Sequence, residues 1–150
     1  MTGIRSVIKE MAGYAPGEQP QAGKYIKLNT NENPYPPSPQ AIAAIESAAR
    51  QGLERYPDPL ATGFRLQAEQ VLGVPADWIL CGNGSDDILT IVTRGFVDSG
   101  SLLRLPYPSY ILYRTLAQIQ DVRWEEVSFQ SDWSLAEDFT QSTDDLRLAF

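Results

Sequence analysis

The segment with the clearest chemical potential is the glycine-rich turn at residues 82–87, with the sequence GNGSDD. The apolar run at residues 78–81 before it predicts a strand, and the residues after it predict the start of a helix. Because the first amides of a helix lack internal partners and carry the positive end of its dipole, such a turn attracts an anion such as phosphate. The alternative is a plain strand-to-helix turn capped by Ser85 or Asp86.

Two common nucleotide-binding motifs do not fit this turn. A P-loop requires a lysine at the helix start, but the chain has no lysine after Lys27. A dinucleotide fingerprint requires a third Gly or Ala where this chain has Asp87, and an acid where the next strand has Arg104-Leu105. The sequence therefore favours the phosphate group of some other ligand.

Two tyrosines could complete such a site. Tyr110 follows the next expected strand, so parallel strands would bring it to the same sheet edge as the glycine turn, where its ring could stack on a flat cofactor. Tyr56, between Arg55 and Pro57, offers a phenol to a phosphate. A phosphate site beside a stacking ring suggests pyridoxal phosphate. The alternatives are that Tyr110 only packs on the sheet and that Tyr56 lies at an interface.

The elements that must position these residues follow from hydrophobic periodicity and capping signals. Ser38, Pro39 and Gly52 predict the cap, first residue and end of a helix with Ile42, Ile45 and Ala49 on one face. A second helix is expected at about 61–72, with Gly73 as its stop and four inward residues. These are Phe64, Ala68, Val71 and Leu72.

Beyond residue 78, short apolar runs alternate with helical periods. This alternation predicts an α/β fold with a mainly parallel sheet that helices cover on both faces. The expected strands are residues 78–81, 102–105, 122–129 and 146–150. The expected helices contain residues 88–96, 112–119 and, as a short helix, 135–139.

Composition excludes several functions. The chain has 150 residues, a net charge of −7 and no histidine, which argues against nucleic acid as a partner and excludes a His-based zinc site or nucleophile pair. No apolar stretch is long enough to span a membrane, no signal peptide is recognisable, and Cys81 is the single cysteine. We therefore expect a soluble cytoplasmic protein without a metal site.

Four segments together resemble one enzyme family. In order and spacing they are similar to the N-terminal part of histidinol-phosphate aminotransferases, class II pyridoxal-phosphate-dependent enzymes. The resemblance runs from about residue 24 to the end. The segments are residues 28–35 (LNTNENPY), 55–58 (RYPD), 82–87 (GNGSDD) and 106–110 (PYPSY).

The resemblance assigns roles to single residues. It implies that backbone amides at Gly84, Ser85 and Asp86 bind the phosphate of pyridoxal 5'-phosphate and that Tyr110 stacks on its ring. Tyr56 would reach the cofactor of the neighbouring subunit of a homodimer. Two arm residues, Glu32 and Asn33, would lie near the substrate.

The resemblance also implies a fold and an organisation. The fold would be that of type I pyridoxal-phosphate transferases: an N-terminal arm (1–37), a helical segment (38–73) and a partial α/β cofactor-binding domain (74–150). The chain is then expected to be a truncated part of the enzyme. The Schiff-base lysine should lie beyond Phe150, so no catalytic residue is expected within the chain and the fragment alone should be inactive.

The implied activity is amino-group transfer between L-histidinol phosphate and 2-oxoglutarate in histidine biosynthesis. Its partners would be a small-molecule amino donor and a 2-oxo acid, with neither nucleic acid nor membrane involved. Two alternatives stay open: a related aminotransferase for aromatic or other amino acids, and a non-catalytic remnant that binds phosphate or a partner subunit.

Overall fold

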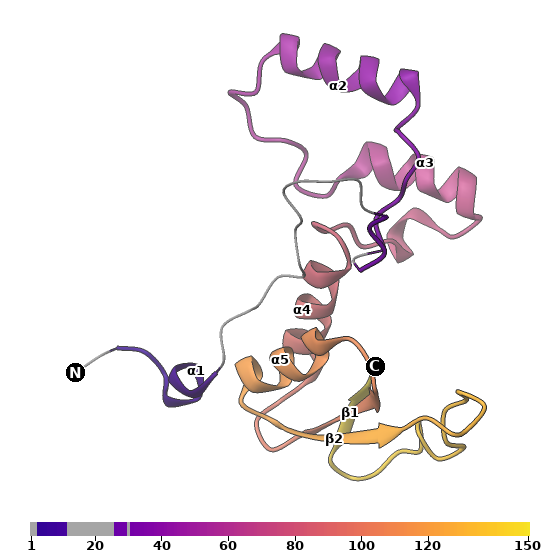
Figure 1. Cartoon of the computed structure of the whole chain (residues 1–150). Helices are drawn as coiled ribbons and strands as arrows, with labels where there is room; N and C mark the ends of the chain where they lie inside the picture. The colour runs from indigo at the N-terminus through magenta and orange to yellow at the C-terminus, as the bar shows by residue number, and fades with distance from the viewer. Residues whose placement is uncertain (1–2, 12–25, 30) are drawn as a thin grey trace.

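The computed structural model describes residues 3–11, 26–29 and 31–150, and these form an α/β arrangement of short helices and a small sheet (Figure 1). The part of the expected arm at residues 12–25, which includes Lys24, lies outside the described residues. The helices are α1 (Ser6–Glu10), α2 (Pro39–Gln51), α3 (Thr62–Leu72), η1 (Ala76–Trp78), α4 (Ser85–Phe96) and α5 (Ile111–Gln120). The strands are β1 (Leu102–Tyr107), β2 (Arg123–Ser128) and β3 (Leu146–Ala149).

The ends of α2 and α3 follow the signals in the sequence. The Ser38 hydroxyl accepts a hydrogen bond of 3.2 Å from the Ala41 amide, and Pro39 is the first helical residue of α2. Gly73 ends α3 in a left-handed conformation (φ 67°), and its amide donates to the Glu69 carbonyl at 2.9 Å. Both predicted helices are confirmed, with bounds within one residue of those expected.

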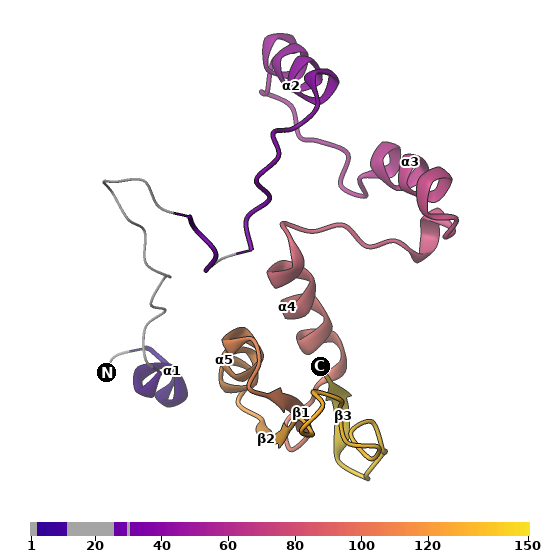
Figure 2. The same ribbon diagram turned by 45° about the vertical axis from the view of Figure 1, so that its right-hand side comes forward.

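The three strands form a parallel sheet in the order β2-β1-β3, which confirms the predicted parallel pairing. Central strand β1 alternates between a buried and a half-buried face, so that Leu103 and Leu105 enter the core. Helices α4 and α5 lie together on that face, as Figures 1 and 2 show. The core between them and the sheet consists of Val97, Leu103, Leu105, Ala117 and Val122, with Tyr113, Leu148 and Phe150 packed against it.

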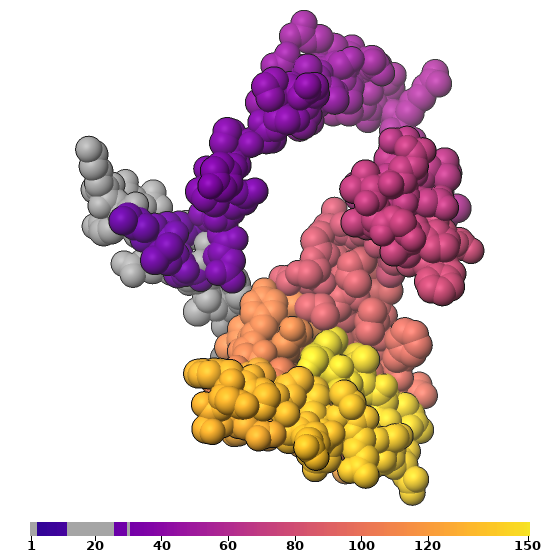
Figure 3. Space-filling model, turned by 90° about the vertical axis from the view of Figure 1, so that its right-hand side faces the viewer, coloured from indigo at the N-terminus to yellow at the C-terminus, as the bar shows by residue number. Residues whose placement is uncertain are grey.

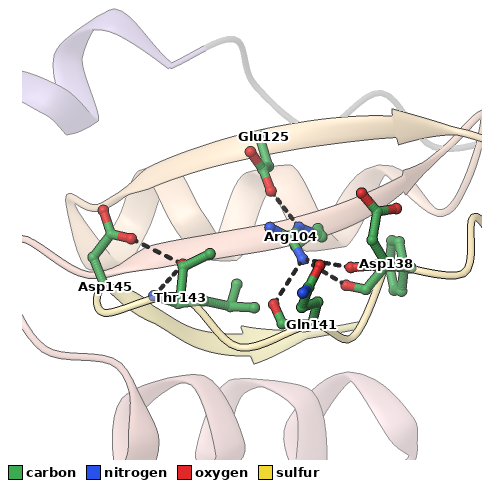
Figure 4. A network of polar contacts seen from close by, with 8 residues as sticks. Arg104, Glu125, Asp138, Gln141, Thr143 and Asp145 are labelled. Atoms are coloured by element: carbon green, nitrogen blue, oxygen red, sulfur yellow. Dashed lines mark hydrogen bonds and ion pairs between the residues drawn. The ribbon is translucent and has the colours of Figure 1, made fainter.

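Among the described residues, no helix covers the opposite face of the sheet, contrary to the prediction of helices on both faces. The β1-to-β2 and β2-to-β3 connections progress across the sheet in opposite directions, so right-handed crossovers place the two connections on opposite faces. The second connection is the irregular segment 129–145. Arg104 of β1 fixes it through hydrogen bonds to the carbonyls of Asp138, Phe139 and Gln141 (Figure 4).

Two predicted elements are absent from the described chain. Residues 78–81 form no strand: Trp78 ends η1, and Ile79 is extended (φ −107°, ψ 121°) but pairs with none of the three strands of the sheet. Residues 135–139 form no helix, because the Phe139 and Gln141 amides close separate turns onto Ala136 and Asp138. So short a helix is costly to nucleate, and the carbonyls of this segment face Arg104 instead.

The apolar faces of α2 and α3 are exposed, which for α3 corrects the expectation that its apolar residues point inward. In α3, Phe64 is 65% exposed, Val71 82% and Leu72 66%, while Ala68 is half-buried. Figure 3 shows these helices reaching away from the part that contains the sheet. Among the described elements, α2 packs against none and α3 only against η1, so the surface that would bury these faces is not among the described residues.

The N-terminal helix α1 is held at the end of α5. The Arg5 guanidinium donates to the Ile119 carbonyl at 2.8 Å and lies 3.6 Å from the Asp121 carboxylate. A cation is favoured at this site because the C-terminus of a helix is the negative end of its dipole. Within the described residues, no helix is long and apolar enough to cross a membrane.

Candidate functional site

The site is built around the start of α4. Gly84 precedes the helix with φ 80° and ψ −179°, a backbone conformation that is almost confined to glycine. An added Cβ at Gly84 would meet nothing within 4 Å, so the requirement for glycine comes from the backbone and not from crowding. The amides of Ser85, Asp86 and Asp87 open the helix and have no acceptor one turn earlier. This end of α4 can therefore receive an anion.

The turn before α4 is closed by Asp87, not by Ser85 or Asp86 as the capping alternative held. Its carboxylate accepts a hydrogen bond of 3.0 Å from the Asn83 amide. A Cβ at Gly82 would lie 2.8 Å from the same carboxylate, so a side chain at this position would displace the carboxylate of Asp87. An acid at the third helical position that reaches back toward the helix start is a known capping signal, and sequence reasoning could have used it here.

The structure brings Tyr110 to this turn. β1 ends at Tyr107, and Tyr110 lies at the start of α5, where its phenol donates to the two carboxylate oxygens of Asp86 at 3.2 and 3.3 Å. The contact joins the start of α4 to the start of α5, through two residues that are 24 positions apart in the sequence. Sequence reasoning expected the ring near the turn, but it did not identify Asp86 as the residue that holds it.

Aromatic residues support Tyr110 on its other side. The Tyr110 ring lies edge-on to Tyr113, with ring centres 5.9 Å apart and planes at 86°. Tyr113 in turn stacks on Phe150, with centres 4.7 Å apart and planes at 9°. A cavity of about 200 Å³ opens between the end of β1 and α5. It is lined by Tyr107, Tyr110, Tyr113 and the ion-paired Arg114 and Glu126, among others.

Tyr56 is fully exposed on the loop between α2 and α3. The shape of this loop depends on Asp58, whose carboxylate accepts hydrogen bonds from the Leu60 amide at 3.0 Å and the Thr62 amide at 2.6 Å. These bonds and the Thr62 hydroxyl lower the pKa of Asp58. The structure thus explains the aspartate of the 55–58 motif, but it does not bring Tyr56 to the start of α4.

Glu32 and Asn33 are exposed on the described part of the arm. Glu32 forms an ion pair with Lys27, and the Asn33 side-chain oxygen accepts a hydrogen bond of 3.0 Å from the Tyr35 amide. These contacts fold the arm locally. They do not place either residue beside α4, so their expected position near a substrate stays a prediction.

Together, the residues at the start of α4 can bind an anion that carries a flat group. They offer helix-start amides to an anion, with a half-exposed phenol ring beside them for a flat group attached to that anion. Among the residues proposed from sequence, Gly84, Ser85, Asp86 and Tyr110 meet in space. Tyr56, Glu32 and Asn33 are not shown to join them.

Comparison with known proteins covers most of the chain. The family described as aminotransferase class I and II matches residues 23–149. A histidinol-phosphate aminotransferase of Rhodopirellula baltica is 57% identical over 145 residues, which cover 96% of this chain and 40% of that protein. Histidinol-phosphate aminotransferase 1 of Trichormus variabilis is 51% identical over 130 residues, which cover 86% of this chain and 37% of that protein.

Solved structures agree in fold. Histidinol-phosphate aminotransferase from Sinorhizobium meliloti, solved in complex with pyridoxal-5'-phosphate, superposes with a TM-score of 0.73 at 21% identity, over 88% of this chain and 36% of that one. A putative aminotransferase from Burkholderia pseudomallei gives a TM-score of 0.69 at 24% identity, over 85% and 39%. The predicted fold class is therefore confirmed. The chain spans about 40% of the length of the curated relatives it matches.

Proposed function

Because the chain belongs to the class I and II aminotransferases, we propose that the whole protein transfers an amino group between L-histidinol phosphate and 2-oxoglutarate, with pyridoxal 5'-phosphate as cofactor. The observation that carries the proposal is the contact between Tyr110 and Asp86 at the start of α4, which joins a stacking ring to an anion site. The choice of amino donor rests on the relatives 57% and 51% identical to this chain, which are named for that reaction.

The residues present fit this cofactor. A phosphate suits the amides of Gly84, Ser85 and Asp86, and the space beside Gly84 is open. The two carboxylates in the first turn of α4 already have donors, since Asp86 accepts from Tyr110 and Asp87 from Asn83. They therefore do not compete for the helix-start amides.

The residues of this chain bind and orient. The amides at the start of α4 would hold the phosphate, and the Tyr110 ring would stack on the pyridine. In a homodimer, the exposed Tyr56 of one subunit would reach the phosphate bound by the other, while Glu32 and Asn33 would approach the substrate. When bound, the cofactor supplies an electron sink for the bond that breaks at the amino-bearing carbon.

The Schiff-base lysine belongs to another part of the whole protein in this proposal. The chain has three lysines: Lys9 is in α1, Lys27 is paired with Glu32, and Lys24 lies outside the described residues. The proposal includes a cytoplasmic enzyme of histidine biosynthesis with small-molecule substrates. A single cysteine and the names of the relatives support it.

A chimera tests the proposal. Residues 23–149 of this chain replace the matching segment of the Rhodopirellula baltica relative, and amino transfer to 2-oxoglutarate is measured with L-histidinol phosphate and with L-phenylalanine as donors. We expect activity within about tenfold of the unmodified relative and the same donor preference. A folded chimera that takes up no pyridoxal phosphate would overturn the cofactor proposal, and a preference for L-phenylalanine would overturn the donor.

A further inference from the structure

The orientation of Tyr110 is fixed from both ends of its side chain. At the outer end, the phenol donates to the carboxylate of Asp86 at 3.2 and 3.3 Å. Along its edge, the ring contacts Tyr113, which is itself stacked on Phe150. The packing against Tyr113 limits where the ring can lie, and the bond to Asp86 links the phenol to the helix that would hold the phosphate.

A carboxylate at this position is unfavourable for an anion site. Asp86 is the second residue of α4, directly after Gly84 and Ser85, and a carboxylate beside a phosphate repels it. An acid in the first turn also stabilises any helix through its dipole, and this would be the purely structural role of Asp86. The contact with Tyr110 gives Asp86 a second role, which can be separated from the first by experiment.

We propose that Asp86 is a positioning residue for Tyr110: its carboxylate holds the phenol and thereby fixes the plane on which the cofactor ring stacks. The proposal rests on the proposed function for the identity of that ring. It assigns the side chain of Asp86 a task distinct from that of its backbone amide. Asp86 then has two opposing effects on cofactor binding, a gain from ring orientation and a loss from charge repulsion.

These opposing effects predict a change of sign. Y110F removes only the orienting bond and weakens binding of pyridoxal phosphate about fivefold, the effect of one ordinary hydrogen bond. With Tyr110 present, D86A removes the bond and the repulsion together, so it weakens binding by a smaller factor. In the Y110F background the orienting bond is already gone, so D86A removes only the repulsion and strengthens binding. A purely structural role in the helix would give D86A the same effect in both backgrounds.

The test uses the chimera that carries residues 23–149 of this chain, with carbon-13-labelled tyrosine rings, observed by NMR and titrated with pyridoxal phosphate. Y110F identifies the Tyr110 signal, and the Tyr113 signal reports that the local fold persists. We expect D86A to shift and sharpen the Tyr110 signal as its ring gains freedom. D86N keeps an acceptor oxygen and should restore the ring signal. D98A removes an exposed charge beyond the other end of α4 and should leave both the signal and binding unchanged.

Two outcomes overturn the inference. The first is a Tyr110 signal in free D86A identical to that of the wild type while Tyr113 is also unchanged. The second is an equal change in affinity on D86A with and without the Tyr110 phenol. If neither wild type nor any variant binds pyridoxal phosphate while the ring signal responds as expected, the proposed cofactor is wrong but Asp86 still positions Tyr110.

Discussion

Arg104 of β1 and Glu125 of β2 are direct partners in the register of the parallel sheet, and their side chains form an ion pair on the face opposite the core. The same guanidinium donates to the carbonyls of Asp138, Phe139 and Gln141 at 3.1, 2.9 and 3.2 Å (Figure 4). The Arg104 side chain is only 11% exposed. One residue thus connects β1, β2 and the segment that leads to β3.

We expect the substitution Arg104→Met to lower the free energy of unfolding by about 2–4 kcal/mol. It keeps the length of the side chain but removes the donors to Glu125 and to three carbonyls, and losing one partner of a shielded charged network is strongly destabilising. Urea unfolding followed by tryptophan fluorescence measures the change.

The matched control is Arg114→Met. Arg114 also pairs with a glutamate of β2, Glu126, but its side chain is 44% exposed and no carbonyl accepts from it among the described contacts. Such an exposed pair contributes about 0–1 kcal/mol. Equal effects of the two substitutions would contradict the role given to the Arg104 network.

The fold could be predicted from sequence where local signals decide it. Ser38 and Gly73 mark helix ends through their own chemistry, and the alternation in β1 reflects which face the core covers. The predictions from sequence were wrong where a segment distant in sequence decides the structure. Residues 78–81 needed a neighbouring strand, and the apolar faces of α2 and α3 needed an opposing surface. No local pattern shows whether such a partner is present.

The candidate site was predictable to a similar extent. The sequence could indicate that Tyr110 and the glycine turn meet, because parallel strands place their following loops at one edge. It could not indicate that the Tyr110 phenol would bond to Asp86 and the Asn83 amide to Asp87. From the sequence, each of the two carboxylates could accept either hydrogen bond. That choice depends on side-chain directions at the first turn of α4.

Gly84 provides a test of the backbone at the helix start. We expect Gly84→Ala to cost about 1–3 kcal/mol, because alanine is strained at φ 80° and ψ −179° even though space for its methyl group exists. Gly95→Ala is the control: it also has open space but lies within α4, where alanine should stabilise by about 0.5–1 kcal/mol. Thermal unfolding of both variants gives the comparison. Stabilisation by both would mean that the turn at Gly84 is not held in this conformation.

Acid should release the loop that carries Tyr56. Hydrogen bonds from the Thr62 side chain and from the Leu60 and Thr62 amides lower the pKa of Asp58 below its ordinary value of 3.8. Because the pKa is lower in the folded chain, the bonds are complete above the ordinary value and are lost as pH falls through the lowered one. Hydrogen exchange at the Thr62 amide should therefore stay protected down to about pH 4 and lose protection below it.

The variant Asp58→Asn separates this loop from other acid effects. Asp132 and Asp145 also have lowered pKa values, through bonds to Ser134 and to Arg123 respectively, so global unfolding in acid would mix several groups. In Asp58→Asn, protection at Thr62 should no longer change at the pH where the wild-type loop opens. A wild-type transition retained in this variant would show that another group controls the loop.

A mixture of two defective chains tests whether Tyr56 acts across a subunit interface, as we propose. In the chimera, Tyr56→Ala and Tyr110→Ala should each impair both sites of a homodimer. A mixed dimer contains one chain of each variant. If Tyr56 acts on the site of the neighbouring subunit, one site of this dimer carries both substitutions and the other site carries neither. Mixing unfolded chains in equal amounts and refolding them should thus restore about a quarter of the intact sites, since half of the dimers are mixed.

The amount of recovered activity distinguishes the two arrangements. If Tyr56 acts within its own subunit, each site of a mixed dimer carries one defect and mixing restores nothing. Refolding each variant alone is the control for losses on refolding, and size-exclusion chromatography verifies that dimers formed. Tyr56 is fully exposed and is not beside the start of α4 in a single chain. A contribution from a second chain is therefore the arrangement that reconciles its exposure with a role at the phosphate.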